Sequence, residues 1–77
     1  MELKFVKAFA IVYGNYRAAL ARCSAVFGEE DEGASLLEVI STAKALLALQ
    51  EALDFDLVER EVLEAAIVEA RESYEAN

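Results

Sequence analysis

Large apolar residues recur through the first third of the chain at alternating steps of three and four. The series misses no position and consists of Val6, Phe9, Tyr13, Tyr16, Leu20, Cys23 and Phe27. Residues with this spacing lie on one face of an α-helix, so the pattern indicates a single buried helical face. Gly28 and the acidic residues after it break the pattern, because glycine commonly ends a helix and like charges repel. The sequence therefore predicts a first helix over residues 3–27.

Two further helices are expected, each preceded by a capping-box motif. Residues 35–38 (Ser-Leu-Leu-Glu) and 56–59 (Asp-Leu-Val-Glu) place side chains that satisfy backbone N–H groups left unpaired at a helix start. These motifs predict helices over about residues 36–53 and 57–75. The connection between them is short, so it forms either a tight corner or a kink in one long helix. The predicted fold is all-α: a three-helix bundle, with a dimer of helical hairpins as the alternative.

The 77 residues are enough for one domain, residues 1–77, with a thin core. The apolar fraction of 57% exceeds the roughly 45 to 50% usual for globular chains, so surplus apolar surface is expected to meet a partner or a second subunit. Rows of small residues lie opposite the predicted core faces of the first two helices. Such rows let helix backbones approach closely, although alanine is also the best helix former on an exposed face. We expect a homodimer formed through Gly14, Ala18, Ala21, Ala25, Ala45, Ala48 and Ala52.

The residue types exclude most catalytic and metal chemistry. Histidine is absent and Cys23 is the only cysteine, so the chain has no internal disulfide, no Cys/His zinc site and no histidine-based catalysis. The acidic run at residues 29–32 does not fit an EF-hand calcium loop. With Gly33 at the sixth position, Gly28 and Val39 stand where carboxylates are required. We therefore expect no enzymatic activity, no metal and no cofactor.

Four single residues on the predicted core faces carry polar or reactive groups that need separate interpretation. Cys23 is expected to be a small buried apolar residue, because a reactive thiol needs an exposed electropositive site. Tyr13 and Tyr16 are expected to be core aromatics with hydroxyls at the boundary, or else anchors for a bound protein. Gln50 interrupts a leucine-rich face. It is either a buried polar residue that fixes register or oligomeric state, or a residue at an uncovered edge.

Charge is divided unevenly along the chain. Residues 1–28 carry a net charge of +3 and residues 29–77 a net charge of −11. Eight of the fourteen acids in residues 29–77 form one run before the second helix and one row on the outer side of the third. They either keep an apolar protein in solution or contact a basic partner. The candidate partner-binding residues are Glu29, Glu30, Asp31, Glu32, Glu61, Glu64, Glu72 and Glu75.

These features favour a small acidic protein-binding module that acts by stoichiometric association, as a regulator or inhibitor of a partner protein with a basic surface. The alternative is a nucleic-acid mimic that inhibits a DNA- or RNA-binding complex, such as a phage counter-defence protein. Direct nucleic-acid binding is not expected, because the bases are few and the net charge of −8 repels phosphates. No membrane span or secretory signal is expected, which predicts a cytoplasmic location, in a cell or an infected host.

Overall fold

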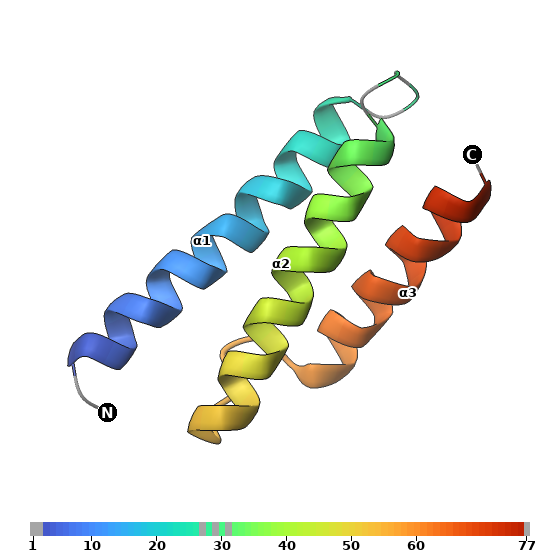
Figure 1. The fold of residues 1–77 in the computed structure, drawn as a ribbon. Helices are drawn as coiled ribbons and strands as arrows, with labels where there is room; N and C mark the ends of the chain where they lie inside the picture. Colours follow the sequence, from blue (N-terminus) through green and yellow to red (C-terminus); the bar gives the residue numbers. More distant parts are fainter. Residues whose placement is uncertain (1–2, 27, 29, 31, 77) are drawn as a thin grey trace.

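The protein is a bundle of three α-helices, seen in a computed structural model (Figure 1). The structure describes every residue except 1–2, 27, 29, 31 and 77. The helices are α1 (Leu3–Ala25), α2 (Glu32–Leu53) and α3 (Arg60–Ala76), and the described residues form no strand. The predicted all-α bundle is confirmed, and α2 and α3 are separate helices rather than one kinked helix. No described helix has the length and apolarity needed to cross a membrane.

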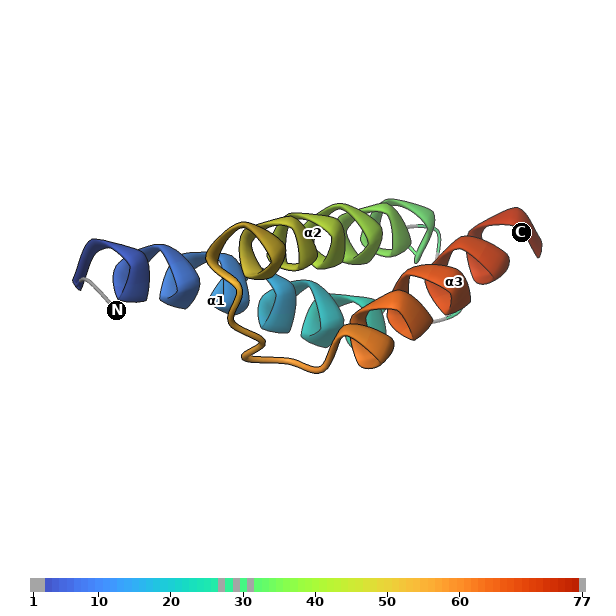
Figure 2. The ribbon, with the colours of Figure 1, turned by 90° about the horizontal axis from the view of Figure 1, so that it is seen from below.

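Helix α2 is the central element. It runs antiparallel to both neighbours and packs against α1 and α3, whereas the described backbones of α1 and α3 do not approach each other (Figure 1). In a view turned by 90° about the horizontal axis, α2 lies above α1 and α3 (Figure 2). The molecule is elongated and flat, with principal extents of 41 × 19 × 13 Å. Side chains, not backbone contacts, therefore connect α1 to α3.

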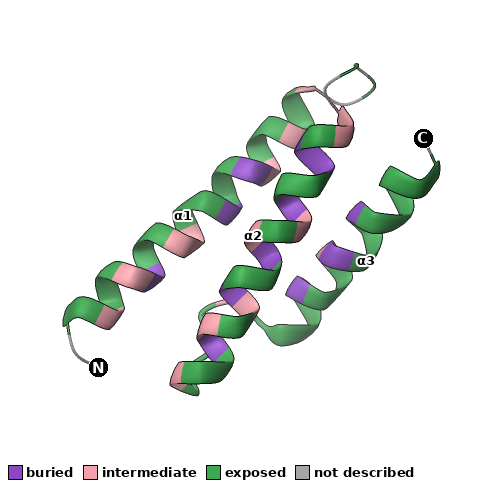
Figure 3. Ribbon diagram, in the orientation of Figure 1, coloured by how far each residue is buried: buried purple, intermediate pink, exposed green. Residues whose placement is uncertain are grey.

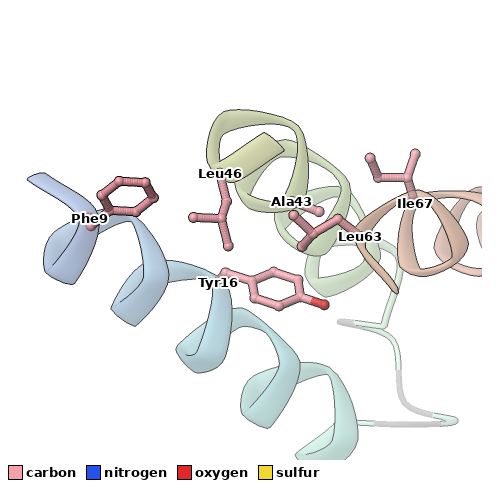
Figure 4. Close-up of a cluster of buried hydrophobic side chains, with 6 residues drawn as sticks. All are labelled: Phe9, Tyr16, Ala43, Leu46, Leu63 and Ile67. Carbon is pink, nitrogen blue, oxygen red and sulfur yellow. The ribbon is translucent and has the colours of Figure 1, made fainter. Parts of the chain in front are cut away.

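The core lies where the inner faces of the three helices converge (Figures 3 and 4). Each helix contributes two side chains to the main cluster, which consists of Phe9, Tyr16, Ala43, Leu46, Leu63 and Ile67. A smaller cluster follows toward the start of α2 and consists of Ala19, Leu36, Val39 and Ala70. The core face predicted for α1 is confirmed at Phe9 and Tyr16, while Val6, at the start of that row, is about half exposed.

Helix α2 begins earlier than its sequence motif predicts. The prediction placed the start near Leu36 with Ser35 as the cap, but α2 begins at Glu32 and Ser35 is buried within it. A carboxylate in the first turn interacts favourably with the helix dipole, and Glu32 Oε2 also accepts a hydrogen bond from the backbone N–H of Gly28 at 3.1 Å. Gly28 has φ +82°, a left-handed conformation that glycine adopts without steric cost. The cap predicted at residues 35–38 is therefore wrong.

The other member of that motif, Glu38, is used elsewhere. Its Oε2 accepts a hydrogen bond from Arg22 Nε at 2.8 Å, which joins α2 to the last turn of α1. Helix α1 ends at Ala25, and the N–H of Val26 donates to the carbonyl of Arg22. The predicted end at Phe27 lies outside the described residues.

Helix α3 begins later than predicted, because a buried side chain takes over the backbone groups of its expected first turn. Gln50 Oε1 accepts the N–H groups of Leu57 and Val58 at 3.0 and 2.9 Å, and Gln50 Nε2 donates to the carbonyl of Val58 at 2.8 Å. The chain therefore stays non-helical as far as Glu59, whose carbonyl accepts the first bonds of α3. The start predicted at residue 57 and the cap predicted at Asp56 are both wrong.

The free energy of unfolding is expected to depend on pH in the alkaline range through the hydroxyl of Tyr16. Burial raises the pKa of its hydroxyl above the ordinary value of 10.0, and the nearby Tyr13 raises it further. The unfolded chain then loses this proton at lower pH than the folded chain. The free energy of unfolding should accordingly fall as pH rises above 10.0, until folded Tyr16 also ionises.

Urea unfolding of the wild-type chain and of Tyr16→Phe, followed from about pH 8 to about pH 11.5, measures this effect. The decline above pH 10.0 should be shallower in Tyr16→Phe, which has no proton to lose at this position. Tyr74→Phe is the matched control, because Tyr74 is 45% exposed. Equal declines in wild type and Tyr16→Phe would contradict the assignment.

Candidate binding surfaces

The outer face of α3 carries a row of exposed carboxylates. It lies opposite the buried residues Leu63, Ile67 and Ala70, so the single packed face predicted for this helix is present. Within the described residues, none of these four side chains forms an ion pair or a hydrogen bond: Glu61, Glu64, Glu72 and Glu75. Val68 lies between the two pairs and is 51% exposed. The face therefore combines unpaired negative charge with an apolar centre.

The acidic run before α2 divides into residues with different surroundings. Glu30 is exposed, and Glu29 and Asp31 lie outside the described residues. Glu32 is half-buried and bonded to the backbone of Gly28, so its carboxylate already has a structural partner. Among the described residues of this run, Glu30 is therefore the one exposed acid.

The predicted rows of small residues are exposed throughout. This holds for all seven positions: Gly14, Ala18, Ala21, Ala25, Ala45, Ala48 and Ala52. A methyl group added at Gly14 would meet no heavy atom within 4 Å, so no contact within the described chain requires a glycine there. The exposed surface of α2 thus includes a row of small side chains at Ala45, Ala48 and Ala52. Self-association through these rows stays a prediction.

Cys23 borders a groove of about 220 Å³ between the ends of the three helices, with Leu36, Ala70 and Glu32 among its neighbours. Cys23 is only partly buried, whereas the sequence predicted a buried residue. Burial raises the pKa of the Cys23 thiol, and the nearby Glu32 raises it further. The thiol is therefore protonated at neutral pH and a poor nucleophile.

A larger apolar groove of about 450 Å³ lies between the first half of α1 and the corner that joins α2 to α3. It is lined by Val6, Phe9, Ala10, Phe55 and Leu57. The rings of Phe9 and Phe55 meet edge to face, with centroids 5.6 Å apart and an interplanar angle of 73°. Sequence reasoning missed this groove. The available indication was a phenylalanine placed between two aspartates in a short connection.

The corner that forms one wall of this groove is held by backbone geometry as well as by Gln50. Helix α2 ends as Asp54 adopts φ +51°, and the N–H of Phe55 then donates to the carbonyl of Gln50 at 3.1 Å. The three bonds of the Gln50 amide fix the next residues, Leu57 and Val58. Gln50 is 1% exposed, so the interpretation that it lies at an uncovered edge is wrong.

Comparisons of the chain with protein-family models, with curated proteins and with solved structures found no match. The function of this protein must therefore be inferred from the surfaces of the chain itself. Within the part of the chain that the structure describes, no three His, Cys, Asp or Glu side chains are grouped so as to hold a metal ion. The features that remain are the acidic face of α3, the small-residue rows and the apolar groove.

Proposed function

We propose that this protein is a small, non-catalytic binding module that regulates or inhibits a partner protein by stoichiometric association. The observation that supports the proposal is the outer face of α3, with four exposed carboxylates that are unpaired within the described residues. Carboxylates that are already paired offer little to a partner. Unpaired ones attract lysine and arginine side chains and accelerate association with a basic surface.

Val68 favours a protein as the partner. Protein interfaces combine an apolar centre with a polar rim, and Val68 is a half-exposed apolar side chain flanked by glutamates along α3. A basic protein surface with a small apolar patch would cover this arrangement.

The alternative proposal is a mimic of nucleic acid that blocks a DNA- or RNA-binding complex. By the helical rise of about 1.5 Å per residue, Glu64 and Glu72 are about 12 Å apart along the axis of α3, with Val68 between them. The carboxylates thus form two pairs rather than a continuous line. This spacing supports the protein-binding proposal better than mimicry of a regular phosphate chain.

Charge reversal on α3 tests the proposal. The partner is first isolated with the wild-type chain by affinity pull-down from the native host and identified by mass spectrometry. Glu64→Lys/Glu72→Lys should then weaken binding by about 100-fold or more, and the affinity of the wild type should fall as salt increases. Reversal of all four glutamates should abolish binding.

The matched control is Glu51→Lys/Glu59→Lys, which changes the net charge equally away from this face and should bind nearly as well as wild type. The exposed Glu51–Arg60 ion pair that it removes contributes little to stability. Circular dichroism establishes that each variant remains helical. Binding that is indifferent to α3 reversal and to salt would eliminate both proposals. Competition between the protein and DNA or RNA for the partner would favour mimicry.

Self-association is the second part of the proposal, since a homodimer would present two acidic faces to its partners. Exposure of the small residues on α1 and α2 supports it, because an interface must be accessible in the single chain. Close approach of two such rows would add van der Waals contacts along the helices.

A further inference from the structure

We propose that the apolar groove between α1 and the α2–α3 corner is the site at which a second copy of this chain docks. This inference rests on the self-association in the proposed function, and it specifies the surface through which two copies make contact. The groove has a volume of about 450 Å³ and apolar lining residues. Three of them are about half exposed to water: Val6 at 48%, Phe55 at 46% and Leu57 at 48%. Covering them removes apolar surface from water, which favours association.

The groove is formed before any partner arrives. Phe55 is positioned by its ring contact with Phe9 and by its backbone bond to Gln50, and the N–H of Leu57 bonds to the amide of the same Gln50. The apolar wall is thus held in place by partly buried hydrogen bonds to Gln50. A preorganised surface loses little conformational entropy on binding.

Charged residues of both signs are sequence neighbours of the residues that line the groove, and they favour a second copy over a purely basic partner. Lys7 lies next to Val6 on α1, and Asp54 and Asp56 flank Phe55 on the corner. All three are exposed, and none has an ion pair within the described residues. In a two-fold dimer each copy brings its aspartates toward the lysine of the other, so both signs are satisfied at once. A basic partner would match only the aspartates.

The exposed surface beside the groove continues along α1. Small or apolar residues recur there at alternating steps of seven and four, which places them on one side of the helix: Leu3, Ala10, Gly14, Ala21 and Ala25. A second copy seated in the groove would also cover these residues, including most of the small-residue row of α1. Residues 1–28 carry the positive share of the charge, so two chains of net charge −8 repel each other least on this side.

The oligomeric state of the full chain tests the inference. Sedimentation equilibrium over about 10 to 500 µM should show a wild-type dimer at the upper end, as expected for a small interface. Leu57→Glu should be monomeric throughout, because it places a charge in the apolar groove. Val62→Glu is the matched control, since Val62 is 49% exposed and does not line the groove, and it should remain dimeric.

Charge exchange supplies a sharper test. Lys7→Glu alone and Asp56→Lys alone should each raise the dimer dissociation constant about tenfold at low salt, because each creates two like-charge contacts. An equimolar mixture of the two variants should dimerise as wild type does, since both contacts then join opposite charges. A partner other than a second copy would not produce this rescue.

Two results would overturn the inference. One is a wild-type chain that stays monomeric over the whole concentration range, which would also remove the self-association proposal. The other is a dimer that Leu57→Glu leaves intact. If Ala48→Glu then dissociates that dimer, self-association proceeds through the small-residue row of α2, and the groove alone is eliminated. The α3 proposal stands or fails separately, because it is measured by binding to the partner.

Discussion

Replacing Gln50 by leucine is expected to lower the free energy of unfolding by about 2 to 4 kcal/mol. The substitution keeps a large side chain in a site that is 1% exposed, but it removes all three hydrogen bonds of the amide. The N–H groups of Leu57 and Val58 and the carbonyl of Val58 then lose their partners. Buried polar groups left unpaired cost about 1 to 3 kcal/mol each, and the corner can recover part of this by opening to water.

Urea unfolding measures the loss, and amide hydrogen exchange locates it. The amides of Leu57 and Val58 should be protected in the wild type and exchange rapidly in Gln50→Leu. Leu46→Met is the control for packing, since a substitution of similar volume at a fully buried position usually costs less than about 1.5 kcal/mol. A Gln50→Leu chain as stable as wild type, with both amides still protected, would show that the corner does not need this side chain.

The same variant connects stability to association. Because the Gln50 amide accepts the N–H of Leu57, its loss frees Leu57, which lines the apolar groove together with Phe55. A looser wall would raise the entropic cost of docking a second copy. Dimerisation of Gln50→Leu should therefore weaken even in solutions where the chain remains folded.

Hydrophobic periodicity predicted the helices of this protein well. The row from Phe9 to Leu20 places its residues on the inner face of α1, and the glutamates of α3 lie outside its single packed face. These predictions depend only on spacing within one helix. The bundle follows because three amphipathic segments with short connections have few other ways to bury their apolar faces.

Local capping motifs predicted the helix starts poorly, for two different reasons. Before α2, Glu32 and Gly28 form a hydrogen bond one turn ahead of Ser35, so the helix begins sooner. Before α3, the side-chain amide oxygen of Gln50 accepts the N–H groups of Leu57 and Val58, which lie in the first turn that the motif predicted. A four-residue motif contains no information about side chains on other elements that bind the same stretch of backbone.

The apolar groove escaped prediction for a related reason. Phe55 and Phe9 are far apart in the sequence and meet only because the corner folds back beside α1 (Figure 2). The sequence does mark Gln50 as unusual, because it interrupts a leucine-rich row. The sequence does not reveal its hydrogen-bond partners at the corner. A glutamine in a leucine-rich row fits a buried contact between subunits equally well.

Replacing Leu63 by alanine should cost about 2 to 5 kcal/mol of unfolding free energy. Leu63 is fully buried and lies in the cluster where side chains of α1, α2 and α3 meet (Figure 4). A domain of this length has a total stability of about 4 to 12 kcal/mol at the usual range per residue. The loss is therefore a large share of the whole, and chemical unfolding with Val68→Ala as an exposed control on the same helix measures it.

The position of Leu63 also predicts which part of the fold loosens first. The described backbones of α1 and α3 make no contact, so α3 is retained through α2 and through the shared side-chain cluster. Removing Leu63 weakens both attachments of α3 and leaves the packing of α1 on α2 largely in place. Amides of α3 should exchange sooner than those of α2, and an equal loss of protection in all three helices would instead mean that the bundle opens as one unit. Because α3 carries the acidic face, Leu63→Ala should also weaken partner binding without changing any charged residue.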